Sequence, residues 1–259
     1  MRGYGFAGRD HLAVLLDFDG TLAEIADRPD DVHLDPSLRG LLERLSHNPR
    51  ILVGVISGRA LEDIRRRIGL EHILYAGNHG LELAGPGWTL AHDDAVEARG
   101  LVAACCDRLS LRLRDVRGAL VENKGLSASV HFRLVPRKNI ETVRRIVLEE
   151  LGRVPPGRLV AREGKMVLEI LPMVDWDKGK AARWLLEHAL GSGWEARCTV
   201  VYVGDDSTDE DAFVALADTG ITIRVAPYPQ PTAARYRVRN VGEVGRLLEA
   251  IAGWMTAPT

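Results

Sequence analysis

The chain has 259 residues, of which 46% are hydrophobic, enough to bury a sizeable core in one large domain or two modest ones. Its 34 basic and 36 acidic side chains leave a formal net charge of −2, which does not favour nucleic acid or an anionic membrane as a partner. No apolar run reaches the roughly 18 residues of a membrane-spanning helix, and no signal-peptide pattern is present. The three cysteines form neither a disulfide framework nor a zinc spacing, so we expect a cytoplasmic protein.

The first predicted element is a short apolar strand over residues 14–16 that leads into two acids, Asp17 and Asp19, and then Gly20. Alternate residues of a strand share a face, so the two carboxylates can point the same way, and glycine permits a sharp turn after them. Acids at the carboxyl end of a buried strand lie where open α/β sheets bind ligands, and their oxygens suit Mg²⁺. An ordinary Asp-Gly turn would explain the same residues without any chemistry.

Strands and helices then alternate up to about residue 92, which predicts a parallel sheet covered on both faces. The first of these helices should begin at Pro36, with Asp35 as its cap. Ser57 follows the second strand, where its hydroxyl and nearby backbone N–H groups can bind phosphate oxygens or cap the next helix. Arg59 is more typical of a helix surface, and we give it little weight.

The pattern changes between residues 93 and 173. It predicts a long helix, two short strands, a second helix and two further strands. Consecutive strand pairs indicate a small, largely antiparallel α+β domain inserted into the first one. We therefore predict a core made of residues 1–92 and 174–259, with residues 93–173 as the inserted domain.

The alternation resumes after residue 173. Lys178 begins a predicted helix, although a lysine at a helix start is usually solvated, and Lys180 competes with it for any role in a site. A strand over residues 199–203 leads into an acidic loop with Asp205, Asp206 and Asp209. This loop is equally consistent with a metal site and with an acidic cap before a helix.

In chain order, Asp17 with Asp19, Ser57, Lys178 and Asp205 resemble the four motifs of the haloacid-dehalogenase-like (HAD) phosphatase superfamily. The resemblance implies an α/β fold, a HAD-type Rossmann-like parallel-sheet core with an inserted, mobile α+β cap of the C2 type. It implies that Asp17 is the nucleophile that becomes an aspartyl-phosphate and that Asp19 is the general acid and base. Ser57 and Lys178 would bind phosphate. Mg²⁺ would be held by Asp17, the backbone carbonyl of Asp19 and Asp205, with water oriented by the neighbouring acids of the loop.

Four further stretches resemble the trehalose-6-phosphate phosphatases, and the resemblance covers nearly the whole chain. They are residues 77–82, 121–124, 129–133 and 164–169. The resemblance implies Mg²⁺-dependent hydrolysis of trehalose 6-phosphate to trehalose and phosphate. The substrate-binding residues that it implies are Glu122, Lys124, Lys165 and Glu169. His79 and Arg133 lie in the same stretches and are further candidates, although His79 could instead satisfy a loop hydrogen bond and Arg133 could be structural.

Acids and lysines on turns can bracket sugar hydroxyls by hydrogen bonding, although ordinary surface charges would look the same. Two positions depart from the usual family pattern, because Leu171 replaces an arginine and Asp177 replaces a common asparagine. Another glycosyl phosphate, such as a glucosyl- or mannosyl-glycerate phosphate, therefore stays open as the substrate. A non-catalytic sugar-phosphate sensor stays open as well. We expect a monomer whose partner is a small-molecule sugar phosphate.

Overall fold

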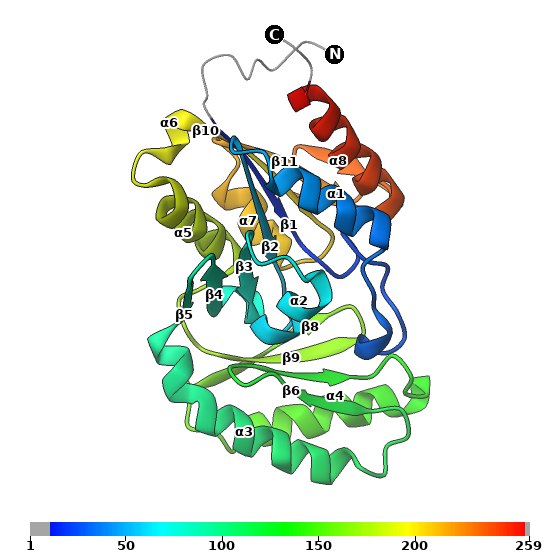
Figure 1. Ribbon diagram of the computed structural model, residues 1–259. Helices are drawn as coiled ribbons and strands as arrows, with labels where there is room; N and C mark the ends of the chain where they lie inside the picture. Colours follow the sequence, from blue (N-terminus) through cyan, green and yellow to red (C-terminus); the bar gives the residue numbers. More distant parts are fainter. Residues whose placement is uncertain (1–10, 257–259) are drawn as a thin grey trace. The chain divides into compact units, whose positions relative to one another are not determined.

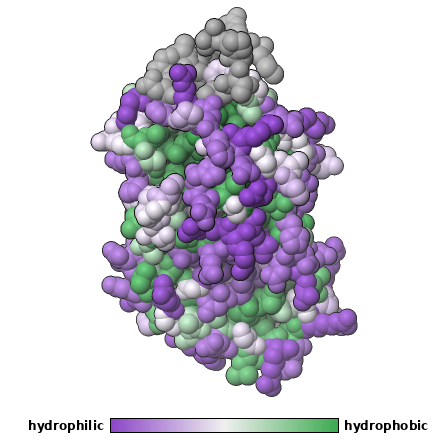
Figure 2. Space-filling model, viewed as in Figure 1, coloured by the Kyte–Doolittle hydropathy of each residue, from purple (hydrophilic) through white to green (hydrophobic). Residues whose placement is uncertain are grey.

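The computed structural model describes residues 11–256, and within them no helix is long and apolar enough to cross a membrane. The chain divides into two compact units. The first unit combines the residues up to Leu90 with those from Trp176 onward, and the second unit consists of Ala91–Asp175. Hydrophilic residues cover most of the face shown in Figure 2, with smaller hydrophobic areas between them.

An eight-stranded sheet forms the centre of the first unit (Figure 1). The strands, in their order across the sheet, are β12 (Tyr236–Val238), β11 (Gly220–Val225), β10 (Cys198–Gly204), β1 (His11–Leu16), β2 (Ile51–Ile56), β3 (Leu74–Gly77), β4 (Glu82–Gly85) and β5 (Trp88–Ala91). Strand β1 lies in the interior and runs parallel to both of its neighbours, β10 and β2. The α/β fold class predicted from the sequence is confirmed.

One edge of this sheet differs from the parallel arrangement expected from the sequence. Strand β4 pairs antiparallel with β3, and β5 lies beyond it. Each of the two strands has only four residues, and the glycines and proline of residues 85–87, where the chain turns between them, are typical of a loop. The sheet is therefore mixed, with a parallel part that contains β1.

Helices cover both faces of the sheet. They are α1 (Pro36–Ser46), α2 (Leu61–Ile68) and α8 (Val241–Thr256) in one hydrophobic cluster, and α5 (Lys178–Leu190), α6 (Trp194–Arg197) and α7 (Asp209–Ala215) in the other. Successive residues of β1 enter different clusters, since Val14 packs in the first and Leu15 in the second. Burial of such a side chain is worth about 1.5–3 kcal/mol, so β1 is firmly held and fixes the position of the residue that follows it. Asp35 caps α1 as expected, accepting a hydrogen bond of 2.8 Å from the backbone N–H of Ser37.

The second unit is a four-stranded antiparallel sheet with two helices packed on one face. The strands, in their order across the sheet, are β6 (Leu120–Asn123), β7 (Ala128–His131), β9 (Val167–Pro172) and β8 (Leu159–Gly164), and the helices are α3 (Asp93–Leu113) and α4 (Arg137–Leu151). Val130 and Ile170 are buried in the core between sheet and helices, together with Cys105 of α3. The predicted order of helices and strands in this part of the chain is confirmed.

Candidate active site

Two acids meet at the carboxyl edge of the parallel strands. Asp17 directly follows β1, and Asp205 directly follows β10. Leu16 lies opposite Val203 in this strand pair, and the backbone N–H of Asp17 donates to the Val203 carbonyl over 2.9 Å. Both acids are buried. The sheet thus brings together two carboxylates that are far apart in the sequence.

Lys178, in the first turn of α5, contacts Asp17 and a third acid, Asp209. Its Nζ donates to Oδ1 of Asp17 over 2.7 Å and to Oδ1 of Asp209 over 2.8 Å. The side chain of Lys178 is only 2% exposed, whereas Lys180 is partly exposed. Asp177 caps the helix by accepting from the backbone N–H of Lys180 over 2.8 Å, so aspartate here performs the capping that asparagine would also perform.

Burial and charge oppose one another in this cluster. Burial raises the pKa of Asp17 well above its usual value, Lys178 lowers that pKa, and Asp209 and Asp205 raise it further. Burial alone would lower the pKa of Lys178, but Asp17 and Asp209 outweigh this effect and raise that pKa. Within the cluster of Asp17, Asp205, Asp209 and Lys178, three carboxylates meet one ammonium group. A further cation would favour ionised Asp17.

Asp209 holds the loop after β10. Its Oδ1 accepts from Lys178 and from the hydroxyl of Tyr202, the latter over 2.8 Å. Its Oδ2 accepts from the backbone N–H groups of Asp205 over 3.0 Å and Asp206 over 2.9 Å. Both oxygens are therefore engaged by protein donors, so we interpret Asp209 as a residue that orders this loop and orients Lys178.

The acids have the spacing of a site for a hard divalent cation. Carboxylate oxygens of Asp17, Asp205 and Asp209 all lie within 4.8 Å of one another. Oxygen ligands at such a spacing suit Mg²⁺. Since Asp209 already accepts four hydrogen bonds, Asp17 and Asp205 remain the candidate side-chain ligands, with the backbone carbonyl of Asp19 as a third.

Gly20 allows Asp205 to lie against the loop after β1. A Cβ atom at Gly20 would be 2.1 Å from Oδ2 of Asp205, closer than any non-bonded contact permits. Gly20 also has a φ of +83°, which favours glycine. Glycine is therefore required here for the turn and for the position of the Asp205 carboxylate.

Arg224 supports the loop after β10 from the neighbouring strand β11. Its Nη2 donates to the carbonyl of Asp205 over 3.1 Å and its Nη1 to that of Asp206 over 3.4 Å. It also forms an ion pair with Glu210, which in turn accepts from the backbone N–H of Ala233 over 2.7 Å. Arg224 thus orders the backbone that directly follows the Asp205 side chain.

Ser57 directly follows β2 and is fully buried. Its Oγ accepts from the backbone N–H of Arg59 over 3.2 Å. Helix α2 begins only at Leu61, with Ala60 as its N-cap and no side-chain capping bond, so the expectation that Ser57 caps this helix is wrong. The hydroxyl orders the turn in which it lies.

His79 lies beside Ser57 within the first unit. Its backbone N–H donates to the carbonyl of Ser57 over 2.9 Å, and its ring packs so closely on Gly58 that a Cβ there would be 2.6 Å from Cε1. Asn78 and His79 have φ values of +50° and +59°, which cost roughly 1–2 kcal/mol each in non-glycine residues. Such strain is typical of segments whose geometry serves a function.

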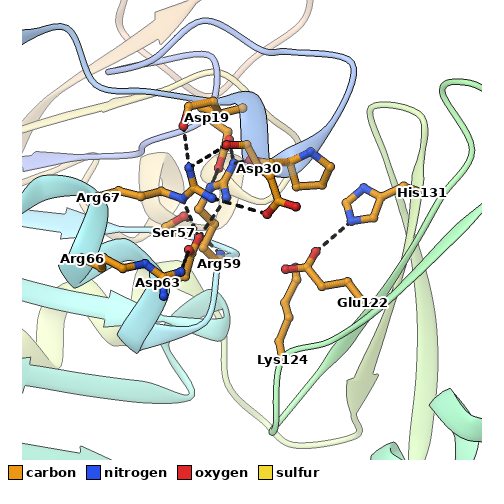
Figure 3. Close-up of polar contacts among 12 residues, drawn as sticks. Asp19, Asp30, Ser57, Arg59, Asp63, Arg66, Arg67, Glu122, Lys124 and His131 are labelled. Atoms are coloured by element: carbon orange, nitrogen blue, oxygen red, sulfur yellow. Dashed lines mark hydrogen bonds and ion pairs between the residues drawn. The ribbon is translucent and has the colours of Figure 1, made fainter.

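The carboxylate of Asp19 is bound by Arg59 (Figure 3). Nε of Arg59 donates to Oδ2 over 2.8 Å and Nη2 donates to Oδ1 over 2.7 Å, so the pair is bidentate. The Arg59 side chain is only 8% exposed, and the expectation that it lies on a helix surface is wrong. Burial works to lower the pKa of Arg59, but hydrogen bonds to Asp19 and Asp63 outweigh burial and raise it.

In the second unit, polar residues form a row across the sheet. The strand register places Glu122 opposite Ser129, Ser129 opposite Glu169, and Glu169 opposite Arg162. The alternate residues of these strands fill the core under α3 and α4, so the row lies on the other face of the sheet. Oε1 of Glu169 accepts from Nζ of Lys124 over 3.2 Å and from the Ser129 hydroxyl over 3.2 Å.

The remaining predicted residues of this unit lie near the row. Glu122 and His131 contact one another at 2.8 Å between Oε2 and Nε2 (Figure 3). Arg133 lies beyond the end of β7 and donates from Nη2 to the carbonyl of Lys165 over 2.9 Å. The turn that contains Lys165 lies between the end of β8 at Gly164 and the start of β9 at Val167.

The family model for trehalose-phosphatases matches residues 15–241. The chain belongs to the trehalose-phosphatase family. The match takes in the predicted motif residues of both units, from Asp17 to Asp205. The HAD-type fold inferred from the resemblance is confirmed with it.

Curated members of the trehalose-phosphatase family are similar over most of this chain. Trehalose-phosphate phosphatase of Mycobacterium avium is 43% identical over 213 residues, which are 82% of this chain and 53% of that protein. Probable trehalose-phosphate phosphatase D of Arabidopsis thaliana is 34% identical over 254 residues, 94% of this chain and 68% of that protein. The chain thus spans about half the length of the first relative and about two thirds of the second. The crystal structure of a trehalose-6-phosphate phosphatase related protein matches with a TM-score of 0.81 and 25% identity, covering 94% of this chain and 98% of that one.

Within this trehalose-phosphatase fold, two supporting residues were missed in the sequence and a third, Arg59, was given too little weight. Arg59 lies two residues after Ser57, but its partner Asp19 is 40 residues away. Tyr202 looks like any other apolar residue of its strand, and Arg224 like an ordinary charge in another. The available signal was a polar group inside an apolar strand, which needs a partner when it is buried.

Proposed function

We propose that the chain is a Mg²⁺-dependent phosphatase that hydrolyses trehalose 6-phosphate to trehalose and inorganic phosphate. The observation that carries the proposal is the contact of Lys178 with Asp17 inside a buried group of three carboxylates. A structural ion pair would balance one acid with one base, whereas this buried cluster has three acids and only one base. Membership of the trehalose-phosphatase family supports the same activity.

Asp17 is the proposed nucleophile of the first step. Its carboxylate oxygen would form a bond to phosphorus while the bond from phosphorus to the sugar oxygen breaks, giving an aspartyl-phosphate. Asp19 would donate a proton to the departing oxygen, which leaves as the hydroxyl group of trehalose. Lys178 orients Asp17 through the contact described above and would offset charge on the phosphate oxygens. Ser57 would offer them its hydroxyl.

Water attacks in the second step. A water oxygen would form a bond to phosphorus while the bond to the Asp17 oxygen breaks, which releases inorganic phosphate and restores the carboxylate. Asp19, now ionised, would take the proton of that water. Asp17, Asp205 and the backbone carbonyl of Asp19 would hold Mg²⁺, which when bound supplies positive charge for the phosphate oxygens.

We propose that residues 93–173 act as the cap that recognises the sugar. The row that contains Glu122 and Glu169, with Lys124 beside it, combines donors and acceptors in the way that several hydroxyl groups require. Arg133 and Lys165, and His79 of the first unit, complete the proposed substrate-binding set. Leu171 is buried at the position where the family usually has arginine, so it offers the sugar no polar group.

Phosphate release from a panel of sugar phosphates tests this proposal. We expect trehalose 6-phosphate to be hydrolysed well ahead of sucrose 6-phosphate, glycosyl-glycerate phosphates and glucose 6-phosphate, with activity lost on chelation and in Asp17→Asn. A different preferred glycosyl phosphate would keep the chemistry and reject the substrate. Binding of sugar phosphates without any phosphate release would instead support the sensor. The monomeric state and the cytoplasmic location stay predictions.

A further inference from the structure

Arg59 is almost fully buried and directs most of its hydrogen-bond donors at two carboxylates and a backbone carbonyl. Two donors bind Asp19, Nη1 binds Oδ2 of Asp63 over 2.9 Å, and Nη2 also donates to the carbonyl of Pro29 over 3.0 Å. The guanidinium carbon lies 5.5 Å from the ring centroid of Phe18, which is itself fully buried. These contacts hold the guanidinium plane from several sides.

Asp63 is itself held in place by two other arginines of α2. Nε of Arg67 donates to its Oδ2 over 2.7 Å, and Nη2 of Arg66 donates to its Oδ1 over 2.6 Å (Figure 3). Asp63 is therefore fixed by its own helix, and it fixes Arg59 in turn. The chain of contacts ends at Asp19, whose side chain is 35% exposed.

A partly exposed aspartate on a loop would otherwise move among several rotamers. A bidentate contact with a guanidinium removes that freedom, because both carboxylate oxygens must face the planar fork. We propose that Arg59 is a positioning residue that holds the Asp19 carboxylate where it can transfer a proton to and from the oxygen atoms at phosphorus. This inference rests on the proposed function, since Asp19 has that task only in a phosphatase.

A purely structural role is the competing explanation, because Arg59 also ties the loop at Pro29 to α2. The two explanations predict a different dependence of the reaction rate on the leaving group. A sugar oxygen needs a proton in order to leave, whereas the oxygen of para-nitrophenyl phosphate leaves without one. Moreover, kcat/KM for a two-step phosphatase reports only the steps up to transfer of phosphorus to Asp17.

The test compares kcat/KM for trehalose 6-phosphate and for para-nitrophenyl phosphate, both with Mg²⁺. We expect Arg59→Met and Arg59→Lys to lower kcat/KM for the sugar phosphate by about 100-fold, because misplacement by about 1 Å and loss of acid catalysis have effects of that size. The value for the aryl phosphate should change by less than about threefold. Lysine should not rescue the sugar phosphate reaction, because an ammonium group cannot form the bidentate contact.

Two further variants separate positioning from folding. Asp63→Asn leaves Arg59 in place but weakens its support, so we expect the same selective loss at about tenfold. Arg65→Ala is the matched control, since Arg65 is an exposed arginine of the same helix, whereas Asp63 is held by Arg66 and Arg67. We expect it to change neither substrate's kcat/KM.

A parallel fall for both substrates in the Arg59 variants would overturn the inference in favour of a structural role. Unchanged values for both would overturn it as well. Wild-type protein that hydrolyses neither substrate would instead overturn the proposed function, an outcome visible before any residue is replaced.

Discussion

Replacement of Gly20 by alanine tests whether Asp205 must lie where the structure places it. The new Cβ would be 2.1 Å from Oδ2 and 2.5 Å from Cγ of Asp205. Asp205 is buried, but the clashing atoms are the end of its side chain. We therefore expect the carboxylate to move and the fold to survive.

The size of the effect follows from two separate costs. A non-glycine residue at a φ of +83° is strained by roughly 1–2 kcal/mol, which lowers the free energy of unfolding. Relief of the contact needs a shift of about 1 Å in the carboxylate, whereas metal–ligand distances tolerate about 0.2 Å. We expect the Mg²⁺ concentration for half-maximal phosphate release to rise by about 10- to 100-fold.

Gly87→Ala provides the matched control. Gly87 has a φ of +81° in the turn between β4 and β5, and a Cβ there would have nothing within 4 Å. Both variants should therefore lose similar stability in urea unfolding, but only Gly20→Ala should need more Mg²⁺ in a titration of phosphate release. Equal Mg²⁺ requirements in the two variants would refute the assignment of Asp205 as a ligand.

Three other predictions concern the remaining parts of the site. Arg224→Met removes the donors to the carbonyls of Asp205 and Asp206. We expect the Mg²⁺ concentration at the midpoint of a thermal-shift titration to rise about tenfold. An unchanged midpoint would contradict the supporting role of Arg224. Burial raises the pKa of Asp63, but hydrogen bonds from its three arginines outweigh this and lower the pKa from 3.8 to about 2. Ionised Asp63 therefore stabilises the fold above about pH 4. About 1 kcal/mol of the free energy of unfolding, a figure discounted for the partial exposure of Asp63, should be lost as the pH falls toward 2. The free energies of unfolding in urea of wild type and Asp63→Asn should therefore converge over this range. Glu169→Gln should lower kcat/KM for trehalose 6-phosphate about tenfold and leave para-nitrophenyl phosphate unaffected, whereas equal losses would argue against sugar recognition by the polar row.

Local patterns predicted the parts of the fold that depend on neighbouring residues. The apolar run before Asp17 identified β1 as a strand that is buried on both faces. Asp17 and Asp19 follow this strand, so they could be placed at the edge of the sheet where the parallel strands end. Asp35 and Pro36 identified the start of α1 for a similarly local reason. The short strands β4 and β5 were missed because they flank the glycines and proline of residues 85–87, which are typical of a loop.

Contacts between distant residues were harder to predict. The pair of Lys178 with Asp17 joins positions 161 residues apart, and only the resemblance to a family suggested it. Arg59 was misjudged because its local pattern is that of a surface helix, whereas its burial is set by Asp19 and Asp63. That Asp209 orients water stays a prediction; the four hydrogen bonds that its two oxygens accept from protein donors could not be foreseen from the sequence.

Formation of an aspartyl-phosphate on Asp17 is the central claim, and a rapid-quench experiment tests it most directly. Protein with Mg²⁺ would be mixed with trehalose 6-phosphate labelled on phosphorus, quenched in acid and digested to locate the label. We expect label on the peptide that contains Asp17 at early times, with none in Asp17→Asn. Full turnover by wild-type protein with no label on that peptide at any time would contradict the claim.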